Sequence, residues 1–89
     1  MKSLKGVVSK IRLLKMSRTP LVRFSLDNVN CLIVTHSLNF LADVDEGMRI
    51  VVAGEFNDRN QFVVRNYSVI GKTKIMIEFE AMKKDLSVS

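Results

Sequence analysis

The chain has little of several residue types on which common functions depend. Its 89 residues include no tryptophan and only one cysteine, one histidine and one proline, and no apolar run approaches the roughly 20 residues of a membrane-spanning helix. The single cysteine, Cys31, excludes a disulfide within the chain and fits a reducing compartment. Because the start of the sequence also lacks the apolar middle of a secretory signal, we expect a cytoplasmic protein with no membrane partner.

The same shortages weigh against catalysis. His36 has no nucleophile or orienting group at a recognisable spacing, and Cys31 lies in an apolar segment where a thiol is inert. One histidine and one cysteine cannot form a structural zinc site. Gly47, Gly54 and Gly71 are spread over separate turns rather than gathered in a phosphate-binding loop. We therefore expect no enzymatic activity, no metal or other cofactor and no small-molecule substrate.

Alternation of apolar and polar residues is the main pattern in the sequence. Apolar residues make up 47% of the chain, which is enough for one packed domain. The pattern predicts strands at residues 5–15, 21–28, 48–56 and 61–70, and a continuous apolar run predicts another at residues 31–35. Leu38, Leu41 and Val44 recur at three-residue spacing and predict a short helix between the third and fourth strands, with Ser37 as its N-cap.

Gly54 interrupts the fourth predicted strand. A glycine inside a strand weakens it, so this position predicts a bulge or a tight bend at which the sheet curls into a barrel. We predict that Phe24 and Phe40 belong to the core of this barrel, which we place at residues 1–72. Residues 73–89 contain one more alternating run, which predicts an extra strand or a helix that packs on the barrel or on a partner subunit.

The order of these elements, with glycines at the strand bends, resembles the OB-fold, an all-β, five-stranded Greek-key barrel. The segments that carry the resemblance are GVVSKI, VRFSL, NCLIVT, GMRIVVAGEF and FVVRNYSVIG. The sequence pattern THSL…GMRIVVAGEF is similar to the sequences of small bacterial single-stranded-DNA-binding proteins of the primosomal replication protein N type. It is also similar to those of short, uncharacterised bacterial OB-fold proteins. The resemblance implies binding of single-stranded nucleic acid on the outer surface of the second and third strands and on the adjoining loops.

Charge is distributed unevenly along the chain. The net charge is +5, and the first 26 residues carry seven basic residues and no acidic one, whereas residues 43–58 carry five acidic residues and one basic one. A basic face attracts polyanions, so we predict largely sequence-independent binding of single-stranded nucleic acid, with DNA favoured. The candidate binding residues are Lys10, Arg12, Lys15, Arg18, Arg23, Arg59, Phe62, Arg65 and Tyr67.

Position in the predicted barrel selects the basic candidates. Alternation in the first two strands places Lys10 and Arg12 on one face and turns Arg23 outward. Lys15 and Arg18 lie in the first loop. By the same reasoning the turn NDRN places an arginine at the tip of the last hairpin, beside the groove that OB-folds use for ligands.

Aromatic residues are few among the candidates. Arg65 and Tyr67 share a face of the fifth strand by parity, so that the first is expected to bind phosphate while the ring of the second stacks on a base. Phe62 is the other stacking candidate, and Phe56, on the opposite side of the turn, fits either the core or the surface. With so few rings, affinity should depend mainly on charge and should weaken with salt.

A protein-interaction module is the alternative interpretation. Residues 31–34 are apolar on both faces of a strand, and residues 75–80 have an apolar side that needs a partner. We therefore expect a homodimer, which is compatible with nucleic-acid binding. In the alternative, the chain is a dimerisation module of a larger assembly with no nucleic-acid ligand, and its basic residues serve solubility alone.

Overall fold

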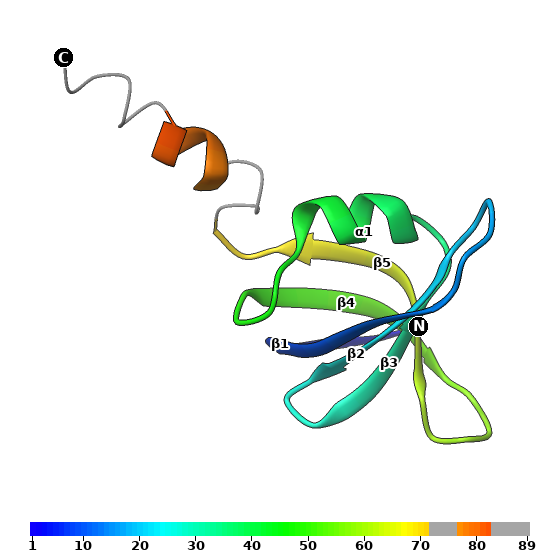
Figure 1. Cartoon of the computed structure of the whole chain (residues 1–89). Helices are drawn as coiled ribbons and strands as arrows, with labels where there is room; N and C mark the ends of the chain where they lie inside the picture. Colours follow the sequence, from blue (N-terminus) through cyan, green and yellow to red (C-terminus); the bar gives the residue numbers. More distant parts are fainter. Residues whose placement is uncertain (72–76, 83–89) are drawn as a thin grey trace, which may run out of the picture.

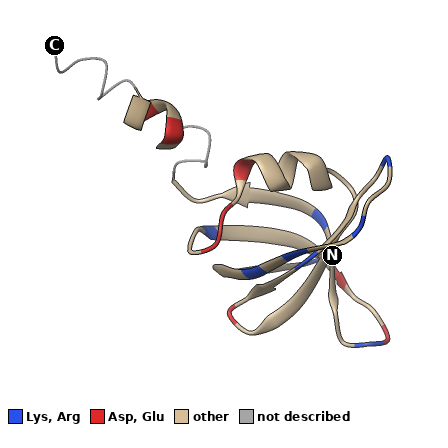
Figure 2. Ribbon diagram, viewed as in Figure 1, with Lys and Arg blue, Asp and Glu red and all other residues tan. Residues whose placement is uncertain are grey.

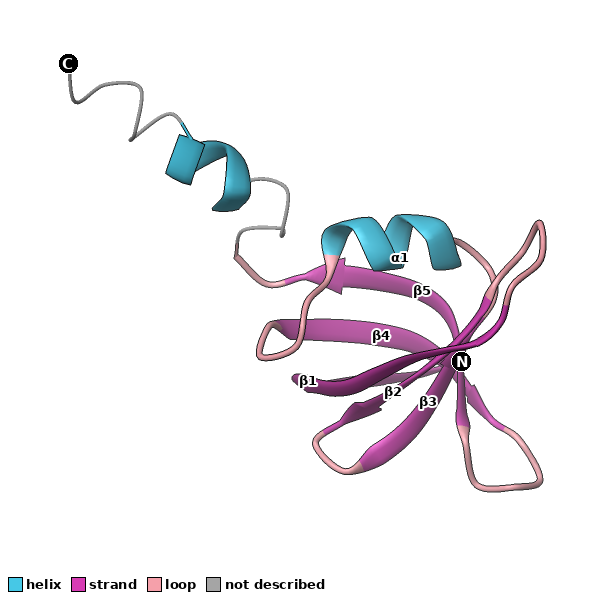
Figure 3. Ribbon diagram, in the orientation of Figure 1, coloured by secondary structure: helices cyan, strands magenta, loops and turns pink. Residues whose placement is uncertain are grey.

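Five strands close into a barrel, with one short helix between the third and fourth strands (Figures 1 and 3). The computed structural model describes residues 1–71 and 77–82. The elements are β1 Lys2–Lys15, β2 Leu21–Leu26, β3 Val29–Ile33, α1 Ser37–Asp43, β4 Arg49–Phe56 and β5 Phe62–Val69. The predicted all-β, five-stranded OB-fold barrel is thereby confirmed. Of the C-terminal segment expected at 73–89, residues 77–82 form a helix, and the remainder lies outside the described residues.

The barrel closes in the order β1-β2-β3-β5-β4. β1 pairs with β2 along one part of its length and with β4 along another, and these pairings are antiparallel. β3 and β5 pair in parallel, with Cys31 beside Phe62 and Ile33 beside Val64. The alternation in β2 matches the prediction, because Val22 and its inward-facing neighbours are buried while the residues between them face outward.

A bulge at Lys10 divides β1 into two halves of opposite parity. Lys10 has a φ of 53°, and the register between β1 and β2 shifts between Ser9 and Arg12. The side chain of Glu46 stabilises this bulge, because its carboxylate accepts a hydrogen bond of 2.9 Å from the Ile11 amide. The expectation that Lys10 and Arg12 share a face by simple parity is therefore wrong: both are exposed, but the bulge lies between them.

A second bulge lies where Gly54 interrupts β4, as predicted. Ala53 pairs with Asn66 and Gly54 pairs with Val64, so Arg65 is the extra residue on β5. Gly54 is buried, and a Cβ atom at this position would overlap the carbonyl oxygen of Val63. Glycine is therefore needed here for a close approach of two backbones, and the bulge increases the curl of the sheet.

Helix α1 contributes an aromatic side chain to the core. The ring of Phe40 is fully buried and stacks on Phe24 with centroids 4.6 Å apart, which confirms the core role predicted for both. Tyr67 of β5 meets Phe40 edge to face at 5.4 Å, and its hydroxyl donates a hydrogen bond of 3.0 Å to Asp43. The predicted N-cap is off by one residue: His36 occupies the N-cap position with a φ of 62° and makes no side-chain capping hydrogen bond, while Ser37 is the first residue of the helix.

Alkaline pH should destabilise this core. Burial raises the pKa of the Cys31 thiol from 9.0 to about 12, and burial together with the hydrogen bond to Asp43 raises the pKa of Tyr67 from 10.0 to about 12. Both groups stay protonated in the folded chain at a pH where they ionise in the unfolded chain. Their contribution to stability is therefore complete below pH 9 and is lost as the pH rises toward 12. At about pH 11 the thiol alone lowers the free energy of unfolding by about 3 kcal/mol.

Denaturant titration of the wild type and of Cys31→Val at about pH 8 and about pH 11 tests this expectation. Valine fills a similar volume at this fully buried position and cannot ionise. The variant should therefore lose less stability between the two pH values than the wild type loses. An equal loss in both proteins would show that the thiol does not cause the alkaline destabilisation.

Candidate nucleic-acid interface

Two arginines lie directly opposite each other on the outer surface of the barrel. Arg12 of β1 pairs with Arg23 of β2, and both are exposed. Side chains of directly opposed residues lie about 4.5–5.5 Å apart at their Cβ atoms, and like charges in this arrangement destabilise a sheet. Neither guanidinium has a hydrogen-bond or ion-pair partner among residues 1–71 and 77–82. An anion bound between the two guanidinium groups would relieve the repulsion.

An apolar strip continues from this arginine pair across the outer surface. Arg23 pairs with Leu32 of β3, which in turn pairs with Val63 of β5. Leu32 and Val63 are half-buried. Leu32 is on the outward side of the strand that the sequence predicted to be apolar on both faces, and Val63 is beside it on β5. The surface thus has a cationic margin on β1 and β2 and an apolar centre on β3 and β5, a feature that alternation within single strands could not reveal.

The loops beside this surface carry further basic residues. Lys15 ends β1, and Arg18 lies in the β1–β2 loop, where the Ser17 hydroxyl donates to the Thr19 carbonyl oxygen at 2.9 Å. Figure 2 shows Lys and Arg along β1, on this loop and at the tip of the β4–β5 loop. Both loops project from the right-hand side of the barrel in this view, whereas the acidic connection between α1 and β4 lies on the left.

The β4–β5 loop is organised by one asparagine. The side-chain oxygen of Asn57 accepts hydrogen bonds of 2.9 Å from the amides of Arg59 and Gln61, and its side-chain nitrogen donates to the Gln61 side chain at 3.0 Å. Asn60 adopts a φ of 61°. These contacts fix the backbone on both sides of Arg59, which is exposed at the loop tip as predicted.

The two aromatic candidates do not present their rings as predicted. Phe62 is fully buried and meets Phe56 edge to face at 5.1 Å, so the expectation that it stacks on bases is wrong. Tyr67 packs against the core and is not on the face of Arg65, because the bulge at Arg65 reverses the parity of β5 at this point. Phe56 is 40% exposed instead, and the Lys2 ammonium lies 5.5 Å from its ring centroid, a contact that sequence spacing did not indicate.

The described part of the chain shows no second site with recognisable chemistry. Residues 1–71 and 77–82 contain no group of three or more His, Cys, Asp or Glu that could hold a metal ion. Cys31 is buried, and the burial that raises the pKa of its thiol also withholds the thiolate needed for reactivity. Over the same residues, no helix has the length and apolar character to cross a membrane.

No family model, curated protein or solved structure matches the chain. The functional assignment therefore depends on the residues of the barrel themselves. Among the basic candidates, the register brings together Arg12 and Arg23, and the loop joining their strands carries Arg18. Arg59 and Arg65 are exposed on the β4–β5 hairpin, and the strand register pairs neither of them with Arg12 or Arg23.

Proposed function

We propose that this barrel binds single-stranded nucleic acid, with DNA favoured, through phosphate contacts on its basic outer surface and largely without regard to sequence. The observation that supports this best is the opposed pair Arg12 and Arg23, whose mutual repulsion lacks a compensating acid among the described residues. We propose further that the chain is a small bacterial OB-fold protein of the single-stranded-DNA-binding kind, that it works in the cytoplasm and that it catalyses no reaction.

Phosphate suits this pair because of its geometry. A guanidinium donates parallel hydrogen bonds to two oxygens of one phosphate, and two opposed guanidinium groups can hold successive or shared phosphates of one strand. The loop residues Lys15, Arg18 and Arg59 extend the positive surface on either side. Nucleic acid with several phosphates therefore fits better than a single small anion.

The apolar strip favours a single strand over a duplex. A duplex keeps its bases stacked inside, whereas a single strand can lay its bases against Leu32 and Val63 while its phosphates reach the arginines. These two side chains lack the flat ring that strengthens base contacts, so charge should supply most of the affinity.

Fluorescence anisotropy of labelled single-stranded DNA and RNA, titrated with the protein over a series of salt concentrations, tests the proposal. The logarithm of the binding constant should fall linearly with the logarithm of salt concentration, with a slope of about 0.7 for each phosphate contacted. A duplex of the same length should bind more weakly. Absence of binding to either polymer at low salt would refute the proposal.

A protein-interaction module remains the second candidate, and one observation favours it. Several large apolar side chains are exposed on the β1–β2 hairpin and beside it, including Leu14 at 49% and Met16 at 79%. We propose that the chain also forms a homodimer.

A further inference from the structure

The tip of the β1–β2 hairpin combines apolar and basic side chains that the barrel does not cover. Leu13, Leu14 and Met16 are 44%, 49% and 79% exposed, and the basic residues Lys15 and Arg18 lie in the same stretch of the chain. We call these five residues the hairpin surface. Exposed apolar side chains of this size, gathered at one loop of a small barrel, are typical of a protein contact.

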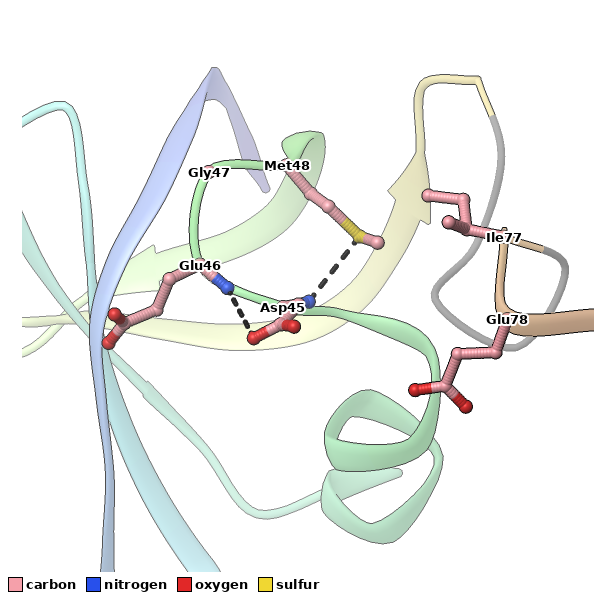
Figure 4. A pocket seen from close by; sticks show the side chains of 6 residues that line it. All are labelled: Asp45, Glu46, Gly47, Met48, Ile77 and Glu78. Atoms are coloured by element: carbon pink, nitrogen blue, oxygen red, sulfur yellow. Dashed lines mark hydrogen bonds between the residues drawn. The ribbon is translucent and has the colours of Figure 1, made fainter. Parts of the chain in front are cut away.

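A groove of complementary character lies elsewhere on the molecule. It has a volume of about 350 Å³ and is lined by the α1–β4 connection, residues 45–48, and by Ile77 and Glu78 of the C-terminal helix (Figure 4). Met48 and Ile77 supply its apolar part and approach each other across it, while Asp45 and Glu78 supply carboxylates and the Glu46 side chain points away toward β1. We call it the acidic groove.

Only part of the acidic charge is used within the chain. The Glu46 carboxylate accepts the hydrogen bond from Ile11 in the β1 bulge, and an Asp45 oxygen accepts one of 2.9 Å from the Glu46 amide. No lysine or arginine of residues 1–71 and 77–82 pairs with Asp45 or Glu78. The groove therefore offers negative charge beside apolar side chains, which complements the positive charge and the apolar side chains of the hairpin surface.

The two surfaces of one molecule are on opposite sides of the barrel. In Figure 1 the β1–β2 hairpin lies at the right, whereas the α1–β4 connection and the helix of residues 77–82 lie at the left. A hairpin consequently cannot enter the groove of its own chain. We propose that the hairpin surface of one copy docks into the acidic groove of a second copy.

The same geometry favours a closed dimer. When two copies lie side by side in opposite directions, each hairpin faces the groove of the other copy, so the contact forms twice around a two-fold axis. Lys15 and Arg18 then meet Asp45 and Glu78, while the apolar side chains of the hairpin cover Met48 and Ile77. In this dimer Lys15 and Arg18 serve the protein contact, and the Arg12–Arg23 pair is left for nucleic acid. The dimer contact forms whether or not the barrel binds nucleic acid.

Two complementary charge-reversal variants test the contact by sedimentation velocity without nucleic acid. Lys15→Glu with Arg18→Glu disables the hairpin surface, and Asp45→Lys with Glu78→Lys disables the groove. The wild type should be a dimer, and each variant should dissociate roughly 100-fold more readily, because repulsion replaces attraction. Mixing the two variants should produce a one-to-one heterodimer, since one copy keeps an intact groove and the other an intact hairpin.

A matched variant separates the contact from net charge. Lys5→Glu with Arg59→Glu makes the same charge change at exposed positions on other parts of the barrel, and it should leave the dimer intact. Circular dichroism checks that each variant is folded. If Asp45→Lys unfolds the groove variant, the single change Glu78→Lys is used in its place. A monomeric wild type, a hairpin variant that stays dimeric or a mixture that stays monomeric would overturn the proposal.

Discussion

Gly54→Ala is expected to unfold the barrel or to lower its free energy of unfolding by about 4 kcal/mol or more, which is a large part of the roughly 5–15 kcal/mol that stabilises a domain. The added methyl group would overlap the carbonyl oxygen of Val63 on the neighbouring strand. Because this obstacle is backbone within the β4–β5 ladder and not the end of a flexible side chain, it can move only if the two strands separate at the bulge.

Gly71→Ala is the matched control for this prediction. Gly71 has a φ of 97°, but a Cβ atom there would meet nothing within 4 Å, so alanine should cost only the backbone strain of about 1–3 kcal/mol. Urea titration followed by circular dichroism measures both variants. If Gly54→Ala were no less stable than Gly71→Ala, the close approach of the strands would not be the reason for glycine at position 54.

Replacement of both opposed arginines by glutamine should weaken single-strand binding by about 10- to 100-fold at low salt, since each arginine supplies charge-assisted hydrogen bonds to phosphate. The salt slope should fall by about 1.4, the share of two single-strand phosphate contacts. The thermal midpoint of the free protein should stay the same or rise slightly, because Arg12→Gln and Arg23→Gln remove a repulsion between directly opposed like charges.

The charge-matched control for this double variant is Lys5→Gln with Arg49→Gln. Both residues are exposed and belong to the β1–β4 side of the barrel, away from the opposed pair. The control should retain most of the affinity and most of the salt slope. An equal loss of affinity in both double variants would mean that the protein attracts nucleic acid through net charge, with no particular role for Arg12 and Arg23.

The strands and the bulge at Gly54 were predictable from the sequence because each depends on local residue types. Alternation locates β2 to within a residue or two, and a glycine inside β4 marks the place where the sheet bends. Lys10 gives no comparable signal. Its left-handed conformation lies at the register shift between β1 and β2, where Glu46, 35 positions away in the sequence, accepts the hydrogen bond of the Ile11 amide.

The candidate site was less predictable from the sequence, because it depends on contacts between residues that are distant along the chain. Bulges reverse the side-chain parity in β1 and β5, so parity counted along the chain placed Tyr67 on the face of Arg65, although Arg65 is itself the extra residue of the bulge. The burial of Phe62 follows from its parallel pairing with Cys31, which only the closed barrel specifies. The opposition of Arg12 and Arg23 likewise depends on the register after the bulge.

The double pairing of β1 also bears on how fast the chain folds. The β1–β2, β2–β3 and β4–β5 hairpins join neighbouring segments, but the first half of β1 pairs with β4 and β3 pairs with β5, across much of the sequence. The chain entropy lost in these two distant pairings must be overcome before the core around Phe40 is enclosed. Closure of the barrel, and not formation of the hairpins, therefore sets the folding rate, which belongs in the millisecond-to-second range of barrels dominated by distant contacts.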